Sequence, residues 1–374
     1  DLSDRLPNHH YTGGWEHFVG GGVALMDCDA DGLPDIFAAG GASPAQLIRN
    51  AGGFQFHRAE VPQIVGATGA YPIDIDADST FRIAEEAQAR GHTLFYYTPD
   101  QLAYKEGKVV ARGWPLNVRR KHGDHYALGD RVEVDLSTFD VLWLRQDPPF
   151  DMGYITTTHL LDRVRDQTLI VNDSFWVRNA PEKLLVLDYP DLTPPTTIAR
   201  DLATIKAFKA KHGDVILKPL YGNGGAGVFR LDVNDRNLSS LHELFTGFSR
   251  EPLIVQKFLP AVSKGDKRVI LMDGGEVGAS NRNPAKGHTQ STMHVGGRPE
   301  KVGLTERDLE ICAAIGPLLK EKGQVFVGID VIGGWLTEIN VTSPTGIQEL
   351  ERFDGVNIAA KIWDAIEARH AAMA

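Results

Sequence analysis

Three oxygen-bearing side chains near the C-terminal end of the chain have the types and the spacing that a hard metal ion requires. Asp330, Glu338 and Asn340 interrupt the apolar stretch QVFVGIDVIGGWLTEINVTSPTG, residues 324–346. This stretch predicts two β-strands, because it is rich in Val, Ile and Phe and is bounded by Gly and Pro. Residues i and i+2 share a face of a strand, so Glu338 and Asn340 should point the same way. Magnesium prefers oxygen ligands of this kind.

The loop of this hairpin decides where Asp330 points. A two-residue turn at Gly333-Gly334 would pair Asp330 with Thr337 and leave Glu338 on the opposite face. A three-residue loop, 333–335, would place Asp330 directly opposite Glu338. Two facing carboxylates repel each other unless a cation lies between them, so we predict the three-residue loop and a divalent ion. Spacing alone also allows an ordinary hairpin with polar side chains on its solvent face.

A second group of residues has the composition of a phosphate-binding loop. Lys218 lies in the apolar run VILKPL, and the sequence GNGGAG, residues 222–227, follows it. Glycines let backbone N–H groups approach phosphate oxygens, and a lysine on the preceding strand can neutralise them. The order strand, loop, strand excludes the P-loop and the Rossmann fingerprint, which both continue into a helix. Taken alone, the pattern also fits a plain glycine-rich hairpin.

A third motif, DCDADGLPD, lies near the N-terminal end. Its four acids Asp27, Asp29, Asp31 and Asp35 stand at positions 1, 3, 5 and 9, with Gly32 at position 6, and the first half resembles a calcium-binding loop. The glutamate that closes an EF-hand loop is missing. We therefore predict Ca²⁺ binding here without an EF-hand.

Composition limits the function classes. The chain has 374 residues, 42% hydrophobic and 24% charged, which is typical of a globular protein with more than one domain. Its formal net charge of -10 argues against a nucleic-acid partner. No apolar run approaches the length of a membrane span, so no membrane association is expected. The two cysteines, Cys28 and Cys312, are too few for a disulfide scaffold or a Cys-based zinc site.

The elements that must position these motifs change in character along the chain. Residues 1–70 are rich in glycine, and short apolar pieces predict small antiparallel strands. From about residue 71 to 182, strands and helices alternate, which indicates an α/β layer. Ser79 is the predicted N-cap of the first helix there, and a further helix is expected over 180–189. Residues 183–370 mix hairpins with helices.

Several short motifs occur in one order: NAPEKL, ILKPL with its glycine loop, IVQKFLP, GDKRV, NRNPAKG, GGR and GID-VIGG-WLTEINVTSPTG. From about residue 76 to the C-terminus, this succession closely resembles the prokaryotic glutathione synthetase family of ATP-grasp ligases. The resemblance implies an α/β fold of the α+β ATP-grasp type. It places a pre-ATP-grasp α/β domain at 71–182 and an ATP-grasp domain at 183–370, with the lid at about 193–262.

The resemblance also implies roles for individual residues. Those expected to bind ATP are Lys183 and Lys218 at the phosphates, Gly222, Asn223, Gly224, Gly225 and Gly227 in the flap above them, and Gln256, Lys257, Phe258 and Leu259 around the adenine. Those expected to hold Mg²⁺ or Mn²⁺ are Asp330, Glu338 and Asn340. Arg268 and Arg282 are expected to face the transferring phosphate and the substrate carboxylate, and Ser343 to bind the peptide.

The reaction implied by the resemblance is the condensation of γ-glutamylcysteine with glycine, which gives glutathione, ADP and phosphate. The carboxylate of the peptide attacks the γ-phosphate of ATP, and the glycine amine displaces the resulting acyl phosphate. A cytoplasmic homo-oligomer is expected. A different amino-acid or peptide acceptor remains an open alternative, as does a calcium-binding interaction protein in which the ligase part is inert.

Two departures from the family pattern bear on these expectations. Residues 1–70 instead resemble an FG-GAP/VCBS-type propeller repeat, whose DxDxDGxxD loop binds calcium; one such blade is expected to be a fragment. In the loop after Arg282, the family's acid, second arginine and asparagine are replaced by His288, Gln290 and Thr292. The lost arginine predicts intact ATP binding with impaired turnover.

Overall fold

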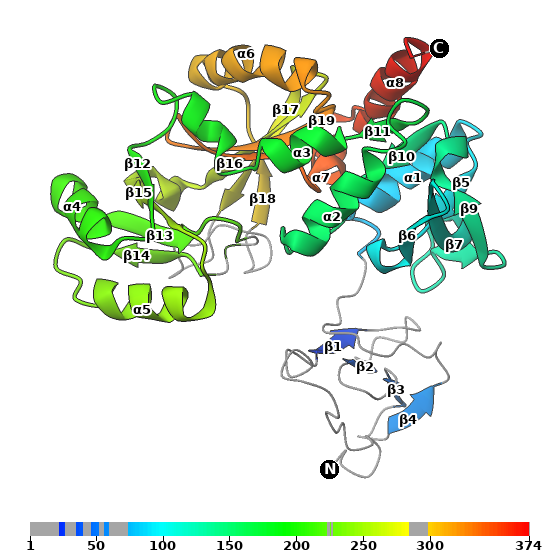
Figure 1. Ribbon diagram of the computed structural model, residues 1–374, viewed down its shortest axis with the longest axis horizontal. Helices are drawn as coiled ribbons and strands as arrows, with labels where there is room; N and C mark the ends of the chain where they lie inside the picture. The colour runs from blue at the N-terminus through cyan, green and yellow to red at the C-terminus, as the bar shows by residue number, and fades with distance from the viewer. Residues whose placement is uncertain are drawn as a thin grey trace. The chain divides into compact units, whose positions relative to one another are not determined.

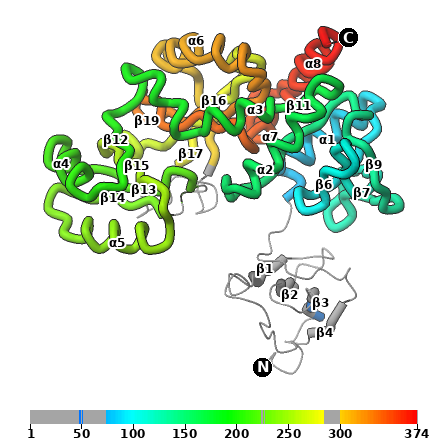
Figure 2. The backbone as a smooth tube through the Cα atoms, in the orientation of Figure 1, coloured from blue at the N-terminus to red at the C-terminus, as the bar shows by residue number. Residues whose placement is uncertain are grey.

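The computed structural model describes residues 22–26, 35–39, 46–51, 56–59, 74–222, 225, 227–283 and 298–373. The chain divides into two compact units, residues 1–76 with 118–127 and residues 77–117 with 128–374. Figure 1 labels the elements, and Figure 2 follows the backbone through them. No helix in the described ranges is long and apolar enough to cross a lipid bilayer.

The first unit contains a four-stranded antiparallel sheet. Its strands β1 (Gly22–Met26), β2 (Asp35–Ala39), β3 (Gln46–Asn50) and β4 (Phe56–Ala59) pair in sequence order. Short antiparallel strands were expected for this stretch, and they are present. The predicted calcium ligands Asp27, Asp29 and Asp31 lie outside the described residues, and the side chain of Asp35 is not described although β2 begins there.

The N-terminal part of the second unit mixes short strands and helices. Two parallel strands, β10 and β11, form one sheet, and β7 pairs with β5, β6 and β9 in another. The elements are α1 (Ser79–Ala89), β5 (Leu94–Tyr96), η2 (Pro99–Gln101), β6 (Leu102–Lys105), β7 (Lys108–Val118), β9 (Val132–Asp135), η3 (Leu136–Thr138), β10 (Val141–Trp143), α2 (Met152–Leu161), β11 (Leu169–Val171) and α3 (Ser174–Asn179). Two of the three residues of β8 (Tyr126–Leu128) belong to the first unit.

Helix α1 begins one residue earlier than its sequence pattern predicts. Its N-cap is Asp78, whose carboxylate accepts the backbone N–H of Phe81 at 2.6 Å. Ser79, the predicted cap, is the first helical residue, and its buried hydroxyl instead accepts the N–H of Gly346 at 3.2 Å. Both side chains are good cap residues, and a contact distant in sequence decides between them.

An antiparallel sheet of order β12-β15-β13-β14 lies in the segment predicted to be the lid, and we keep that name for it. The lid consists of β12 (Thr196–Ala199), α4 (Leu202–His212), β13 (Val215–Pro219), β14 (Phe229–Leu231), α5 (Leu238–Phe248) and β15 (Leu253–Lys257). Its core joins Ile205 of α4 and Leu238 of α5 to Val215, Leu217 and Val255 of the sheet. Figure 1 shows both helices beside this sheet. The lid therefore has a hydrophobic core of its own.

The C-terminal part is built on an antiparallel sheet of order β18-β17-β16-β19-β20. Its elements are η5 (Pro260–Lys264), β16 (Asp266–Met272), β17 (Gly275–Asn283), β18 (Arg298–Lys301), α6 (Glu306–Glu321), β19 (Phe326–Ile332), β20 (Trp335–Asn340), α7 (Ile347–Asp354) and α8 (Ile358–Ala371). Alternate residues of β16 enter different cores: Val269 and Leu271 pack with α6, whereas Ile270 packs with α7 and α8. Helices therefore cover both faces of this sheet.

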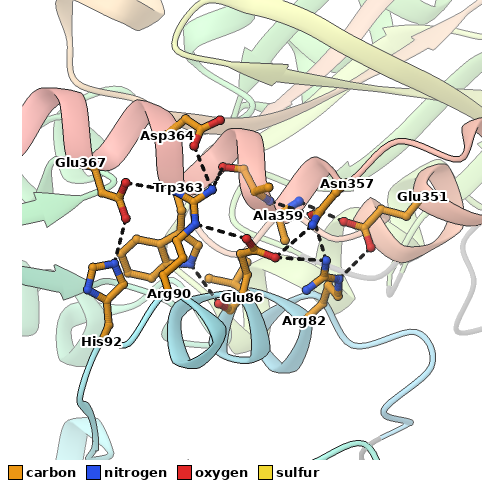
Figure 3. A network of polar contacts seen from close by, with 12 residues as sticks. Arg82, Glu86, Arg90, His92, Glu351, Asn357, Ala359, Trp363, Asp364 and Glu367 are labelled. Atoms are coloured by element: carbon orange, nitrogen blue, oxygen red, sulfur yellow. Dashed lines mark hydrogen bonds and ion pairs between the residues drawn. The ribbon is translucent and has the colours of Figure 1, made fainter.

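Ion pairs fasten α1 to α7 and α8 (Figure 3). Arg82 binds Glu86 and Glu351, with a distance of 2.8 Å from Nε to Oε2 of Glu351. Arg90 binds Glu86, Asp364 and Glu367, with distances of 3.1, 2.8 and 2.9 Å. We call these six residues, Arg82, Glu86, Arg90, Glu351, Asp364 and Glu367, the α1–α8 network. Beneath it, the indole N–H of Trp363 donates to the carbonyl of Ile83 at 2.9 Å.

Candidate active site

The hairpin β19–β20 places Asp330 directly opposite Glu338, as predicted. The predicted three-residue loop is wrong. Ile332 pairs with Trp335, so the turn has two residues, Gly333 and Gly334. Their φ values of 58° and 81° are those that a tight hairpin turn of this length favours and that glycine tolerates.

A β-bulge restores the register that this short turn would otherwise shift. Val331 pairs with Leu336, and the register changes between Asp330 and Val331, so that Thr337 is the extra residue of β20. The hydroxyl of Thr337 donates to the backbone carbonyl of Asp330 at 3.1 Å. Asp330 and Glu338 therefore face each other because of a bulge and not because of a longer loop.

Asn340 extends this pair along the same strand. Its amide nitrogen lies 3.1 Å from the carbonyl of Gly328, its partner across the hairpin, and 3.4 Å from Oδ2 of Asp330. The three predicted metal ligands are thus neighbours. Among the described residues, no group of three or more His, Cys, Asp and Glu side chains could hold a metal ion. A metal at Asp330, Glu338 and Asn340 would need further oxygen ligands, which phosphate groups would provide.

Two lysines converge on Glu338. Nζ of Lys218, on β13, lies 3.1 Å from Oε1 of Glu338, and Nζ of Lys183 lies 3.7 Å from the same oxygen. Both lysines are buried. Burial alone would raise the pKa of Glu338, but Lys183 and Lys218 hold it below its usual value. Glu338 is therefore ionised at neutral pH.

Two arginines converge on Asp330. Arg268, on β16, donates from Nε to Oδ1 at 2.6 Å and from Nη2 to Oδ2 at 3.1 Å. Nη2 of Arg282, on β17, lies 2.8 Å from Oδ1. Despite burial, Arg268 and Arg282 hold the pKa of Asp330 well below its usual range. We call the six residues Lys183, Lys218, Arg268, Arg282, Asp330 and Glu338 the β19–β20 cluster.

Asp266 is a member of this site that the sequence interpretation missed. Its Oδ2 lies 2.6 Å from Nη2 of Arg282. Burial raises the pKa of Asp266 to about 6, with Arg282 opposing the shift and Asp330 adding to it. The motif GDKRV contained the signal, because Asp266 and Arg268 are two residues apart on one strand and so share a face.

Gly328 makes room for the arginine on this face. A Cβ atom added to Gly328 would lie 2.9 Å from Nη1 and 3.1 Å from Cδ of Arg268. The guanidinium group therefore lies against bare backbone of β19 on its way to Asp330. Any larger residue at position 328 would force Arg268 to move.

Lys183 lies in a turn between α3 and η4 (Leu185–Asp188), where a continuous helix was predicted. The prediction is wrong because the backbone of the turn bonds elsewhere: the carbonyl of Glu182 accepts the N–H of Ile339 at 3.2 Å. Lys183 donates to the carbonyl of Gly222. The first lysine of the predicted phosphate site thus contacts the start of the predicted flap.

The flap joins β13 to β14. Gly225 and Gly227 have φ values of 78° and 69°, and a Cβ atom on Gly227 would lie 3.0 Å from Cγ of Pro219. Glycine is therefore required at this bend. Asn223 and Gly224 lie outside the described residues, so their predicted role stays a prediction.

The predicted adenine-binding segment begins in the lid and continues past the end of β15. Gln256 is buried and donates to Oγ1 of Thr196 at 3.0 Å. The backbone N–H groups of Lys257 and Phe258 both donate, at 2.9 Å, to carbonyls of Pro195 and Asp214. The backbone N–H groups of Lys257 and Phe258 therefore already donate to carbonyl groups of the protein. Leu259 precedes η5, where its carbonyl accepts the N–H of Val262 at 3.1 Å.

The predicted peptide-binding residue Ser343 lies in the loop 341–346 that follows β20. Two charged residues hold this loop from either side. Glu182 accepts hydrogen bonds from the backbone N–H groups of Val341 and Thr342 and from the hydroxyl of Thr342, at 2.8 to 3.3 Å. Arg145 donates to the carbonyl of Pro344 at 2.8 Å. Sequence reasoning missed Glu182 and Arg145 because their partners are distant in the chain.

Comparison with known proteins identifies the family patterns in this chain. Residues 70–178 match the prokaryotic glutathione synthetase N-terminal domain, and residues 182–355 match the prokaryotic glutathione synthetase ATP-grasp domain. A protein of Brucella melitensis named glutathione synthetase is 59% identical over 297 residues, which are 79% of this chain and 95% of that protein. One from Vibrio vulnificus, with the same name, is 42% identical over 304 residues, 81% of this chain and 96% of that protein.

Solved structures resemble the fold at low sequence identity. The ATP-grasp ligase PsnB, complexed with its minimal precursor, has a TM-score of 0.53 at 18% identity and covers 80% of this chain and 96% of its own. The D-cycloserine synthetase DcsG has a TM-score of 0.52 at 18% identity, covering 63% of this chain and 86% of its own. These likenesses show an ATP-grasp fold, as expected from the sequence.

Proposed function

The chain belongs to the prokaryotic glutathione synthetase family, and we propose that it joins γ-glutamylcysteine to glycine, with ATP converted to ADP and phosphate. The activity is that of an ATP-dependent carboxylate–amine ligase. The observation that carries the proposal is the β19–β20 cluster, in which two cations lie on each of two facing carboxylates. Four cations, three of them buried, meet the two facing acids and Asp266, which leaves an excess of positive charge that suits a polyphosphate.

In this proposal, the side chains of the protein promote the reaction by positioning the substrates and by stabilising negative charge. Lys183 and Lys218 bind phosphate oxygens, and the flap that begins at Gly222 covers them. Arg268 and Arg282 lie where charge builds up as the γ-phosphoryl group moves to the peptide carboxylate. The resulting acyl phosphate lies beside loop 341–346, where the glycine amine displaces the phosphate. No side chain of the protein has to act as a nucleophile.

A divalent ion fits the hairpin by the chemistry of its donors. Asp330, Glu338 and Asn340 would hold the ion through oxygen atoms, as Mg²⁺ or Mn²⁺ requires. When bound, the ion supplies charge neutralisation to phosphate oxygens. Asp266 would keep Arg282 in place when Asp330 turns its oxygens to the metal, since it binds the same guanidinium nitrogen.

Further properties of the proposal concern the cell and the remaining segments. The substrates are small molecules, and we place the reaction in the cytoplasm and expect a homo-oligomer, as the family resemblance implies. The net charge of -10 supports the absence of a nucleic-acid partner. We retain Ca²⁺ binding by the acids of DCDADGLPD as a proposal for the N-terminal segment. We also retain as a proposal the likeness of residues 1–70 to a propeller repeat.

The experiment that tests the function is ADP release by the full chain with Mg²⁺, ATP and γ-glutamylcysteine, with and without glycine. Glycine-dependent ADP release with formation of glutathione is expected. A panel of other amino acids in place of glycine tests acceptor choice, and a faster reaction with another amine would replace the glycine assignment. Gln290→Arg should raise turnover about ten- to hundredfold if the lost arginine limits it. An unchanged rate would contradict that account.

A further inference from the structure

A pocket includes the predicted phosphate-binding residues Lys183 and Gly222 in its wall but none of the residues predicted to bind adenine or metal. Its volume is about 480 Å³, including the part open to solvent, and its walls come from the 148–150 loop, α2, α3, the 181–184 turn and the 220–222 segment. Three aromatic rings form much of it: Phe150 lies 5.0 Å from Tyr154 and 5.7 Å from Tyr221, between ring centroids. Most of the remaining lining is proline, valine and leucine.

One polar group in this wall lacks a partner. The side chain of Tyr154, on α2, is completely buried, and within the described part of the chain its hydroxyl makes no hydrogen bond. A buried hydroxyl without a partner costs free energy, so a group of this kind indicates a missing ligand atom.

The polar end of the pocket lies toward the reacting groups. Lys183 and Gly222 line it on the phosphate side, and Thr342 lines it next to Ser343 in the loop proposed to bind the peptide. A substrate whose carboxylate attacks a phosphate bound at Lys183 would have its adjacent side chain at the mouth of this pocket.

The components of the proposed reaction can be assigned to sites by their chemistry. Glycine has no side chain and needs no apolar pocket. The adenine is expected at residues 256–259, none of which lines this cavity. The γ-glutamyl head carries an ammonium and a carboxylate, which need charged partners. The two charged residues in this wall have other partners, because Glu182 accepts hydrogen bonds from residues 341–342 and Lys183 is proposed to bind phosphate. The one small, weakly polar group left is the CH₂SH group of the cysteinyl residue, on the carbon next to the reacting carboxylate.

We infer that this pocket binds the cysteinyl side chain of the acyl-donor peptide, with the Tyr154 hydroxyl donating a hydrogen bond to its sulfur. The inference rests on the proposed function and adds a specificity determinant to it. Aromatic rings surround the sulfur favourably, and the hydroxyl distinguishes a thiol from a methyl group of similar size. Tyr154 acts on substrate choice and takes no part in phosphoryl transfer.

The test compares three acyl donors that differ only in this side chain: γ-glutamylcysteine, γ-glutamyl-α-aminobutyrate with a methyl group in place of the thiol, and γ-glutamylglycine with none. Glycine-dependent ADP release is measured for the unaltered protein and for Tyr154→Phe. We expect kcat/KM for γ-glutamylcysteine to fall about fivefold in the variant, mainly through KM. The values for the other two donors should change less than about twofold, and KM for ATP should stay constant.

The matched control is Tyr104→Phe, because Tyr104 is 53% exposed on β6 and lies outside the pocket. It should leave all three donors unchanged. Thermal unfolding of Tyr154→Phe should occur at the same or a higher temperature, since an unpartnered hydroxyl is removed.

Two results would overturn the inference: equal losses for all three donors, or unchanged discrimination between the thiol and the methyl donor in Tyr154→Phe. As a second variant, Leu184→Phe narrows the pocket wall and should harm γ-glutamylcysteine more than γ-glutamylglycine, while ADP binding measured by calorimetry is kept. An equal loss for both donors with intact ADP binding also counts against the pocket. If no donor supports glycine-dependent ADP release in the unaltered protein, the proposed function fails instead.

Discussion

Two clusters of charged side chains in the second unit carry opposite proportions of charge. In the α1–α8 network, two arginines are surrounded by four carboxylates, and Asp364 and Glu367 have side chains 67% and 43% exposed. In the β19–β20 cluster, four cations surround two carboxylates, the side chain of Asp330 is 7% exposed, and the neighbouring Asp266 adds a third carboxylate through Arg282. The first cluster satisfies its guanidinium groups within the protein. The second concentrates positive charge where water is scarce, and its natural complement is an anion from outside.

The comparison predicts that substitutions in the β19–β20 cluster lower turnover, whereas substitutions in the α1–α8 network lower stability. The largest effect is expected for Lys218→Met, which removes one of the two cations on Glu338. Turnover should fall about 10²- to 10³-fold, because a fixed positive charge is lost at the transferring phosphate. Glycine-dependent ADP release measures the loss, and Arg90→Met in the α1–α8 network serves as the control with unchanged turnover. Similar turnover in Lys218→Met and Arg90→Met would contradict the proposed difference in function between the two clusters.

The second prediction concerns metal binding by the free protein. Because each of Asp330 and Glu338 already has two cationic partners, Mn²⁺ alone should bind at least about tenfold more weakly than Mn²⁺ in the presence of ADP. Calorimetric titration of the full chain with Mn²⁺, with and without ADP, measures the difference. Asp330→Asn should abolish the gain from ADP. Equally tight binding without nucleotide would mean that the hairpin is a metal site in its own right.

The third prediction tests the α1–α8 network. Arg90→Met should lower the free energy of unfolding by about 1 kcal/mol, since its partners are partly exposed and surface ion pairs contribute little individually. Its additional hydrogen bond to the carbonyl of Ala360, at 2.8 Å, supports a value above that of a single pair. Urea unfolding measures the change. A loss of turnover without a loss of stability would assign the network to the chemistry instead.

The smallest expected effect is a pH dependence of stability in the same network. The pKa of Glu86 is lowered, chiefly by the hydrogen bond from Asn357, against burial and with help from Arg90 and Arg82. A carboxylate with a lowered pKa stabilises the fold above its unfolded pKa, near 4.5, and loses this contribution as pH falls through the folded pKa. Glu86→Gln should therefore flatten the fall in urea midpoint below about pH 4.5. An unchanged slope would contradict this assignment.

The sequence predicted which residues of the hairpin meet, but not the geometry that brings them together. The apolar pattern and the two glycines predicted the strands and the turn, and the repulsion of two acids predicted that Asp330 faces Glu338. The bulge at Thr337 could not be predicted, because a bulge depends on cross-strand pairing and has no signal of its own in local composition. The same limit explains Ser79, where a contact with Gly346 decides which of two good caps begins the helix.

Local sequence patterns also could not predict residues that act through partners distant in the sequence. Asp266 was detectable from its spacing to Arg268, whereas Glu182 and Arg145 bind a loop about 160 to 200 residues away. Tyr154 has no motif at all. Only the arrangement of α2 against the 181–184 turn shows that its hydroxyl is buried and has no hydrogen-bond partner among the residues that the structure describes.

Glu182 and Lys183 are consecutive residues, yet they contact different parts of the site. Lys183 reaches the flap and Glu338, and Glu182 holds the loop of Ser343. A nucleotide that repositions Lys183 would therefore also shift Glu182 and, through it, the loop proposed to hold the peptide. We expect the two substrates to bind with a shared coupling free energy, so that each raises the affinity for the other by the same factor. The peptide bond between Glu182 and Lys183 would thus transmit the effect of binding one substrate to the binding site of the other.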